Sequence, residues 1–178
     1  MKLLMHICCA NCCLYPLQAL KEKGISTSGL WFNPNIHPYS EYRERLKALK
    51  YLQEEWRLDI DYSDNYGLRE FIRAVVNRED NRCGYCYSTR LEKTAKKAKE
   101  YGFDAFTTSL LVSPYQKIDI IRKTGERLAE KYNMEFFFED FRTGYSKGVE
   151  ISKALGLYRQ KYCGCIYSEE ERYLNKKT

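Results

Sequence analysis

The N-terminal stretch MKLLMHICCANCCLYPLQALKEKG, residues 1–24, sets the pattern for the whole chain. Residues 2–7 are a short apolar run that predicts a buried strand, and the cysteines follow where this strand ends. Pro16 is tolerated in the first turn of a helix and Gly24 is typical of a helix end, so residues 16–24 predict a helix. The first unit is therefore a strand, a cysteine-bearing loop and a helix.

Strands and helices alternate through the rest of the sequence. The expected strands cover residues 28–33, 58–63, 103–109 and 134–140, and the expected helices cover residues 39–56, 67–76, 83–102, 113–133, 145–157 and 168–177. Parallel strands need crossover connections, so this order predicts an α/β, doubly wound fold with a mainly parallel, Rossmann-like sheet and helices on both faces. No repeat or linker divides the chain, and residues 1–178 are expected to form a single α/β domain with cysteine-bearing loops.

Composition favours a cytoplasmic protein that does not contact a membrane. There is no run of eighteen or more apolar residues, and the N-terminus lacks the long apolar region and cleavage site of a secretory signal. The formal net charge of +6 makes a polyanionic partner plausible, and sixteen tyrosines offer faces that can stack on bases. In a reducing compartment, eight cysteines indicate metal ligands or redox groups rather than disulfides.

The cysteines form three groups, each next to an expected helix start. They are the four of HICCANCC (residues 6–13), the C-x-x-C pair Cys83 and Cys86, and the C-x-C pair Cys163 and Cys165. Free backbone N–H groups and the helix dipole stabilise thiolates at such positions. In a doubly wound sheet the ligand crevice lies beyond the carboxyl ends of the strands, so we expect a metal site there. The usual glycine-rich phosphate loops are absent, and nucleotide binding has no support from motifs.

Two metal sites fit these cysteines. The first is a structural zinc site with four thiolate ligands, which leaves four cysteines unassigned. The second is an iron–sulfur cluster tied together by three chain segments, which explains the surplus better. The C-x-x-x-C-x-x-C spacing of radical enzymes is not present, because Tyr15 occupies its third cysteine position.

Four long segments resemble the QueH-type epoxyqueuosine reductase family. They are HICCANCC (6–13), FNPNIHPYSEYRERL (32–46), CGYCYSTRLEKTAKKAKEYGFDAFTTSLLVSPYQ (83–116) and EDFRTGYSKGVEISKALGLYRQKYCGCIYSEE (139–170). The resemblance implies an oxidoreductase of tRNA processing that catalyses the last step of queuosine biosynthesis. It reduces the epoxide of epoxyqueuosine at the tRNA wobble position to the alkene of queuosine, with iron–sulfur chemistry and no cobalamin. The partners are then tRNA carrying epoxyqueuosine and an unidentified electron donor.

Seven cysteines are the predicted ligands of the cofactor, which we expect to be an iron–sulfur cluster, 4Fe-4S, with an additional mononuclear iron beside it. They are Cys8, Cys9, Cys12, Cys83, Cys86, Cys163 and Cys165. Cys13 is left out because the family's first motif usually has a small residue there, just as it has proline where this chain has Asn11. A four-iron cluster uses at most four thiolates, so the others can hold the second iron, which would polarise the epoxide oxygen.

Three further residues are predicted to be catalytic. Asp140 follows the last expected strand and is a candidate oxygen ligand of the second iron, with an N-cap or an ion pair with Arg142 as the alternative. His37 lies in a loop at the crevice rim and is a candidate proton donor or substrate contact. Tyr115 donates a hydrogen bond to the substrate or caps the turn at the start of a helix. His6, inside a strand, is expected to be a core histidine.

The basic residues have two interpretations. Arg159, Lys161 and the KTAKKAK run (93–99) are candidate phosphate contacts, but a charge run on a helix is usually a solvated face. The rival functions are a zinc- or cluster-stabilised RNA-binding protein and a sulfur-transfer protein acting on tRNA. The sulfur-transfer enzyme should have an ATP pyrophosphate loop, which this sequence lacks.

Overall fold

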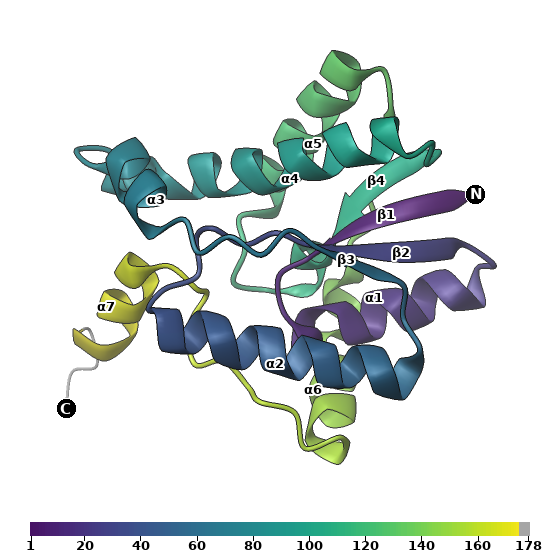
Figure 1. Cartoon of the computed structure of the whole chain (residues 1–178), viewed down its shortest axis with the longest axis horizontal. Coiled ribbons are helices and arrows are strands. Elements are labelled where there is room, and N and C mark those ends of the chain that lie inside the picture. The colour runs from purple at the N-terminus through teal and green to yellow at the C-terminus, as the bar shows by residue number, and fades with distance from the viewer. Residues whose placement is uncertain (175–178) are drawn as a thin grey trace.

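A five-stranded sheet forms the centre of the molecule in the computed structural model, which describes residues 1–174 (Figure 1). Its strands are β1 (Lys2–Ile7), β2 (Ser26–Trp31), β3 (Ile60–Tyr62), β4 (Ala105–Thr108) and β5 (Glu135–Phe136). Their order is β3-β2-β1-β4-β5, and all neighbouring strands are parallel. The predicted doubly wound α/β fold is confirmed.

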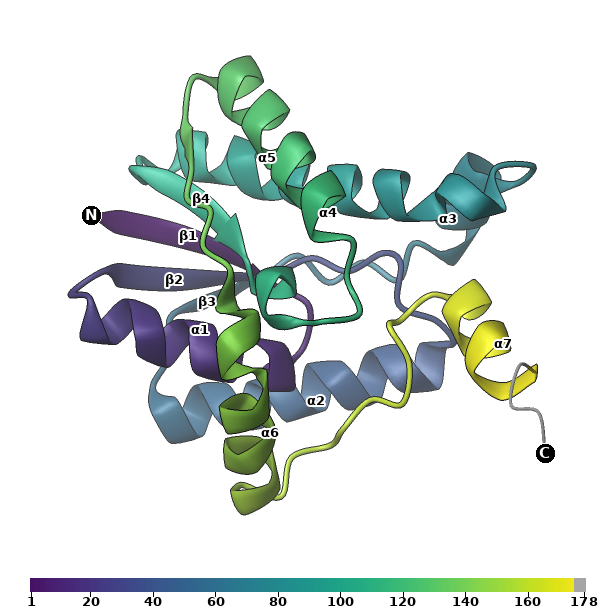
Figure 2. The same ribbon diagram turned by 180° about the vertical axis from the view of Figure 1, so that it is seen from behind.

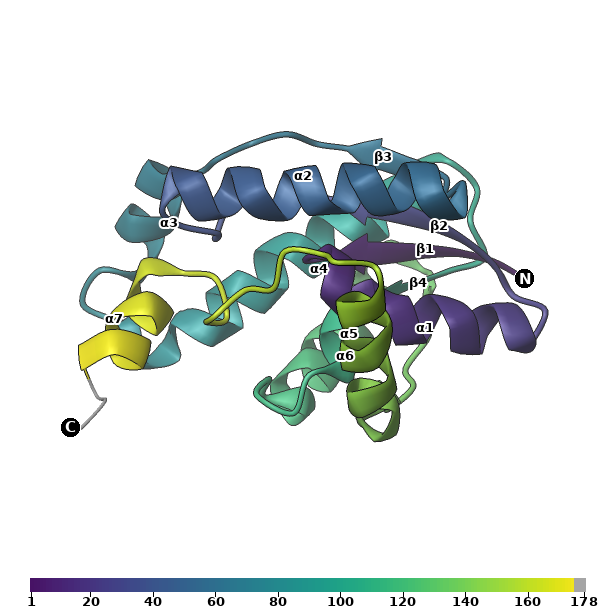
Figure 3. The same ribbon diagram turned by 90° about the horizontal axis from the view of Figure 1, so that it is seen from below.

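Helices cover both faces of this sheet. Helices α1 (Ala10–Glu22) and α2 (Tyr39–Trp56) lie on one face, and α4 (Arg82–Glu100) and α5 (Ile118–Tyr132) lie on the other (Figures 1 and 3). The remaining elements are the helices α3 (Leu68–Val75), α6 (Tyr145–Ala154) and α7 (Ile166–Leu174), and the 3-10 helices η1 (Glu79–Asn81), η2 (Ser109–Val112) and η3 (Phe141–Gly144). Within residues 1–174, no helix is long and apolar enough to cross a membrane.

Strand order reverses between β1 and β4, and the candidate site lies where these two neighbouring strands end. The chain runs from β1 outward through β2 to β3, and then crosses back to place β4 on the other side of β1. His6 pairs with Thr108 in the register of the two strands, so the cysteines after β1 and the residues of η2 emerge side by side. Residues 155–165 run from α6 to α7 on this side of the molecule (Figure 2).

Several predicted boundaries are wrong. Helix α1 begins at Ala10, so Pro16 lies inside the helix, where the N–H it lacks is the one that would bond the Cys12 carbonyl. Helix α5 begins at Ile118, which leaves Tyr115 in a loop. The backbone N–H of Lys117, just before the helix, donates to the Tyr87 hydroxyl at 3.1 Å, a contact outside the helix. Strand β5 has only two residues. The last expected helix extends to residues 175–177, which lie outside the described residues.

Candidate functional site

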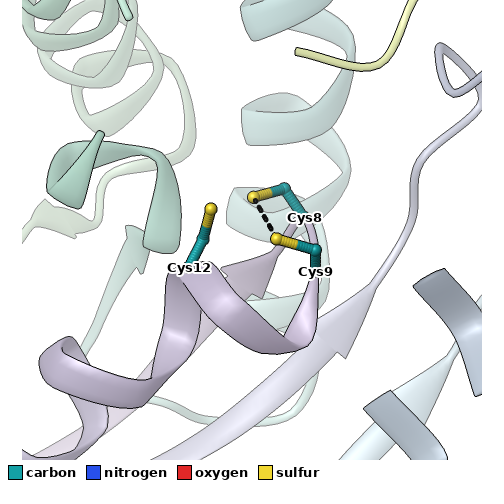
Figure 4. Close-up of side chains that lie close together, drawn as sticks. All are labelled: Cys8, Cys9 and Cys12. Atoms are coloured by element: carbon teal, nitrogen blue, oxygen red, sulfur yellow. Dashed lines mark hydrogen bonds between the residues drawn. The ribbon is translucent and has the colours of Figure 1, made fainter. Parts of the chain in front are cut away.

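The first cysteine group lies where β1 ends and α1 begins (Figure 4). Cys8 and Cys9 follow the strand, and Cys12 lies in the first turn of the helix. Their Sγ atoms all lie within 4.8 Å of one another, and the Cys8 and Cys9 sulfurs are 3.9 Å apart. A single metal with tetrahedral thiolate ligands at about 2.3 Å holds sulfur atoms about 3.8 Å from one another. The three side chains therefore have the spacing of a metal-binding group.

Neighbouring side chains donate hydrogen bonds to these sulfur atoms. The Ser109 hydroxyl lies 3.4 Å from Cys8 Sγ. The side-chain amide of Gln160 lies 3.1 Å from Cys9 Sγ and 3.6 Å from Cys12 Sγ. Hydrogen bonds from Cys12 and Cys9 hold the pKa of Cys8 well below the usual range of a thiol, whereas burial raises the pKa of Cys9. Cys8 is thus the thiol of the group that ionises first, and the thiolate is the form that binds a metal.

Two other residues of the N-terminal stretch belong to the core. Cys13 is fully buried, and its thiol donates to the Ala10 carbonyl at 3.2 Å. His6 is also fully buried, and its two ring nitrogens lie 2.9 Å from Thr108 Oγ1 and 3.1 Å from Asn33 Oδ1. Burial lowers the pKa of His6 to about 3, so the ring is neutral at pH 7. The structure places both side chains in structural positions.

The second cysteine group joins two segments that are far apart in the sequence. Cys83 and Cys86 open α4, and Cys163 and Cys165 immediately precede α7. All four line one cavity of about 340 Å³. Cys86 and Cys165 are also buried together against Phe71 in a small apolar cluster separate from the main core. Within residues 1–174, only the first group has three metal-ligating side chains within 4.8 Å of one another.

Hydrogen-bond donors also reach the second group. The side-chain amide of Gln116 donates to Cys163 Sγ at 3.2 Å, and the Arg90 guanidinium donates to Cys86 Sγ at 2.9 Å. Burial raises the pKa of Cys86 to about 12, although Arg90 opposes this effect. Without a metal, Cys86 is therefore a neutral thiol at pH 7.

The charge of Arg90 acts on both cysteine groups. It is 2% exposed, and its Nε donates to the Cys86 carbonyl at 3.0 Å. Burial disfavours the charge, but Cys86, Cys8 and Cys163 together raise the pKa of Arg90. In the described part of the chain, the ion pairs within 4.0 Å do not include Arg90. Among residues 1–174 this buried guanidinium pairs with no carboxylate, so the cysteine sulfurs are the groups that can supply negative charge to it.

The segment before α7 is fixed by two polar side chains. Arg45, buried on α2, donates to the Tyr162 carbonyl at 2.9 Å and to the Cys163 carbonyl at 2.8 Å. Asn11, in the first turn of α1, donates to Gln160 Oε1 at 2.6 Å. These contacts hold the Gln160 amide beside the first cysteine group and Cys163 beside the second.

Asp140 lies at the start of η3, four residues beyond the end of β5. Its Oδ1 accepts the Arg142 backbone N–H at 3.1 Å, and its Oδ2 lies 2.6 Å from Arg142 Nη2. The hydrogen bond from the Arg142 side chain lowers the pKa of Asp140. This is the N-cap and ion-pair geometry that the sequence offered as the alternative, and Asp140 does not line the two larger cysteine-bearing cavities that the described residues enclose. Its role as a metal ligand stays a prediction.

The other two predicted catalytic residues, His37 and Tyr115, differ in their exposure to solvent. His37 is fully buried, packs on Phe71 at a centroid distance of 5.1 Å, and has its Nε2 3.1 Å from the Pro34 carbonyl. Burial lowers the pKa of His37 to about 4, so it is neutral at pH 7 and holds its proton toward Pro34. Tyr115, by contrast, is 79% exposed and lines the cavity of the second cysteine group. Of the two, only Tyr115 is open to a ligand in this geometry.

The candidate phosphate contacts lie in two different places, on α4 and beside the cysteines. In the KTAKKAK run, Lys97 pairs with Asp61 and Lys96 lies 4.0 Å from Glu100, so two of its four lysines have a carboxylate partner. Arg159 and Lys161 line a second cavity of about 670 Å³, which adjoins the first and also includes Cys12. The two basic residues near the cysteines are therefore better placed to meet an anion.

Sequence reasoning missed several residues of the site. The missed side chains are Arg45, Arg90, Gln160, Asp80 and Glu171, of which the last two line the cavity of the second cysteine group. Arg90 follows Cys86 by one helical turn, which was a usable signal for a contact with its sulfur. The other four residues belong to the site through contacts between distant segments, which no local sequence pattern predicts.

Comparisons with known proteins give one consistent result. The family model described as "Epoxyqueuosine reductase QueH" matches residues 3–171. A protein of that name from Dehalococcoides mccartyi is 40% identical over 172 residues, which cover 97% of this chain and 94% of the relative. A protein of the same name from Thermotoga maritima is 37% identical over 178 residues, covering 95% of this chain and 91% of the relative. One from Helicobacter pylori is 36% identical, over 93% of this chain and 49% of the longer relative.

Proposed function

Because this chain belongs to the epoxyqueuosine reductase QueH family, it is an oxidoreductase that converts epoxyqueuosine to queuosine, and we propose that an iron–sulfur cluster on its thiols carries the electrons. Conversion of an epoxide to an alkene takes up two electrons and two protons and releases the oxygen as water. An external reductant supplies the electrons, and a cluster when bound transfers them. A second iron with an open coordination position would act as a Lewis acid toward the epoxide oxygen.

The donor set supports this cofactor. The close spacing of Cys8, Cys9 and Cys12 suits a single metal ion, and we assign the second iron to them. The four thiols of the second group line a cavity of about 340 Å³, which has room for a cluster, and we assign the cluster to them. These four ligands are Cys83, Cys86, Cys163 and Cys165.

The observation that carries the proposal is the unpaired buried charge of Arg90. A buried cation without a counter-ion is strongly destabilising, and it persists in proteins only where an anion compensates it. Metal binding converts neutral thiols such as Cys86 to thiolates and so supplies the missing negative charge beside Arg90. Gln160 and Gln116 also donate hydrogen bonds to cysteine sulfurs, and such bonds raise the reduction potential of a thiolate-bound metal centre.

Tyr115 completes the proposed chemistry. Tyr115 lines both cavities, and we propose that its phenol contacts the substrate at their junction. The substrate is epoxyqueuosine within tRNA, and the reaction belongs to the cytoplasm, where eight free thiols remain reduced.

Anaerobic purification followed by iron, sulfide and zinc analysis tests the cofactor, and turnover of epoxyqueuosine-containing tRNA with a chemical reductant tests the reaction. We expect iron and acid-labile sulfide in the wild type, loss of both with activity in Cys83→Ala, and retention in the matched control Cys13→Ala, whose thiol lies in the core. Zinc without iron or sulfide, together with no turnover, would refute the proposal and support a zinc-stabilised RNA-binding protein.

A further inference from the structure

The larger cavity, which we call the outer cavity, opens directly onto the cysteine site. It has a volume of about 670 Å³ and includes Cys12 of the first group and Cys163 of the second. It also shares Tyr115, Ser168 and Glu171 with the cavity of the second group. A substrate whose reacting atoms lie between the cysteines would therefore extend into the outer cavity.

The charge of the outer cavity is positive. Arg159, Lys161 and Arg172 line it, and the ion pairs formed within residues 1–174 include none of them. Glu171 also lines the cavity, but its carboxylate pairs with Arg82. Unpaired arginine and lysine side chains around a cavity are suited to phosphate groups.

Aromatic rings lie among these cations. Tyr115, Tyr145 and Tyr162 line the outer cavity, and Tyr115 meets Tyr145 edge to face at a centroid distance of 6.2 Å. Tyr115 is 79% exposed, which leaves most of its ring without a protein neighbour. An exposed aromatic face beside unpaired cations is the arrangement that binds single-stranded RNA, because bases stack on the ring while cations meet the backbone.

We infer that the outer cavity binds a nucleotide adjacent to the modified one, with its base against Tyr115 and its phosphate on Arg159 and Lys161. This inference rests on the proposed function and extends it, because the enzyme then recognises an unstacked RNA segment rather than the modified nucleoside alone. An acidic electron-transfer protein is the other class of partner that a basic surface suits. It would not need an aromatic ring exposed within a cavity, so the contacts favour RNA.

Binding of a synthetic, unmodified anticodon stem–loop RNA to the anaerobically purified protein tests the inference without any turnover. We expect Tyr115→Ala to weaken binding about tenfold, in the range found for the loss of one base stack. Arg159→Gln should weaken it several-fold and reduce the slope of log affinity against log salt by about 1. The matched controls are Tyr101→Ala, an exposed tyrosine at the end of α4, and Arg122→Gln, which pairs with Glu126 on α5. Both should bind as wild type does.

Wild-type affinity in Tyr115→Ala and Arg159→Gln would overturn the inference, as would equal losses in the controls. If the two variants bind RNA normally but accept electrons more slowly from an acidic redox protein, the cavity is a reductant-docking surface and the RNA inference is wrong. Failure of the proposed function has a different signature. In that case the wild type does not reduce epoxyqueuosine, while the binding measurements above still show whether the outer cavity holds RNA.

Discussion

Substitution of Arg90 by methionine separates a structural arginine from one that compensates a metal centre. Arg90 Nη2 lies 2.9 Å from Cys86 Sγ, and the side chain is buried. If Cys86 is a thiolate, Coulomb's law with an effective dielectric constant of about 20 gives a gross attraction of about 6 kcal/mol at this distance. If Cys86 is a neutral thiol, that attraction is absent and the buried charge is a cost.

The expected effects therefore have opposite signs in the two states of the protein. In the metal-free protein, Arg90→Met should leave the free energy of unfolding unchanged or raise it by about 1–4 kcal/mol, as found when buried charges are replaced by apolar groups of similar volume. In the metal-loaded protein, a net loss of only about 1.4 kcal/mol of the attraction lowers the binding constant tenfold. Metal should then be lost to a chelator at least about tenfold faster.

Urea unfolding of the metal-free protein and the rate of iron loss to a chelator measure these two effects. Arg122→Met is the matched control, because Arg122 is exposed and its ion pair with Glu126 is of the kind worth about 0–1 kcal/mol. A metal-free Arg90→Met protein that is destabilised by several kcal/mol, with unchanged iron retention, would show that Arg90 is needed for packing and not for compensation of the thiolates.

Three further predictions concern residues around the site. Asp140→Ala decides between a ligand role for Asp140 and the N-cap and ion pair described above. The N-cap and ion pair lead us to expect a free energy of unfolding in urea that is lower by about 1 kcal/mol, with iron content and turnover kept. Loss of turnover with sulfide retained would instead establish the ligand role. His37→Gln should make folding less sensitive to acid, because the folded pKa of His37, about 4, is below the unfolded value of 6.5 and the unfolded state therefore binds more protons between these values. From pH 7 to pH 5 the free energy of unfolding of the wild type should fall by about 2 kcal/mol more than that of the variant. Equal losses would contradict the burial of the His37 ring. Asn11→Asp replaces the amide that donates to Gln160 Oε1 with an acceptor, so urea unfolding should show a loss of about 1–3 kcal/mol, and unchanged stability would mean that this hydrogen bond does not hold the segment.

The fold follows from the sequence because the alternation of strands and helices is regular and strands β1 and β4, which lie side by side, are almost entirely buried. Parallel pairing and the position of the first cysteine group at the end of β1 were both predicted from this alternation, whereas the cysteines of the second group do not follow a strand. Boundaries were wrong where distant contacts decide them. Tyr115 lies outside α5 because Lys117 N–H and Gln116 both bind the Tyr87 hydroxyl, and no local pattern contains that information.

The site was predictable only as far as its ligand types. Cysteine pairs are rare and their spacing is informative, so all seven candidate thiols lie in the two groups described here. Arg90 lies one helical turn after Cys86, so its contact with that sulfur had a local signal that was not used. Arg45 had none, because an arginine on an amphipathic helix has the same local pattern whether it faces solvent or a buried backbone carbonyl. Only the packing of α2 against the segment before α7 distinguishes these two cases.

The attachment of α7 links the cofactor to the substrate site. No residue of α7 is buried, and the contacts that hold its start include the Cys165 side chain in the small cluster with Phe71 and the pair between Arg82 and Glu171. Such a helix has little apolar burial to stabilise it, so metal ligation of the cysteines that precede it would add a further anchor. Arg172, also on α7, lines the outer cavity. Binding of the proposed cofactor would therefore stabilise the same helix that contributes Arg172 to the proposed RNA site, so that both proposed sites would share one structural support.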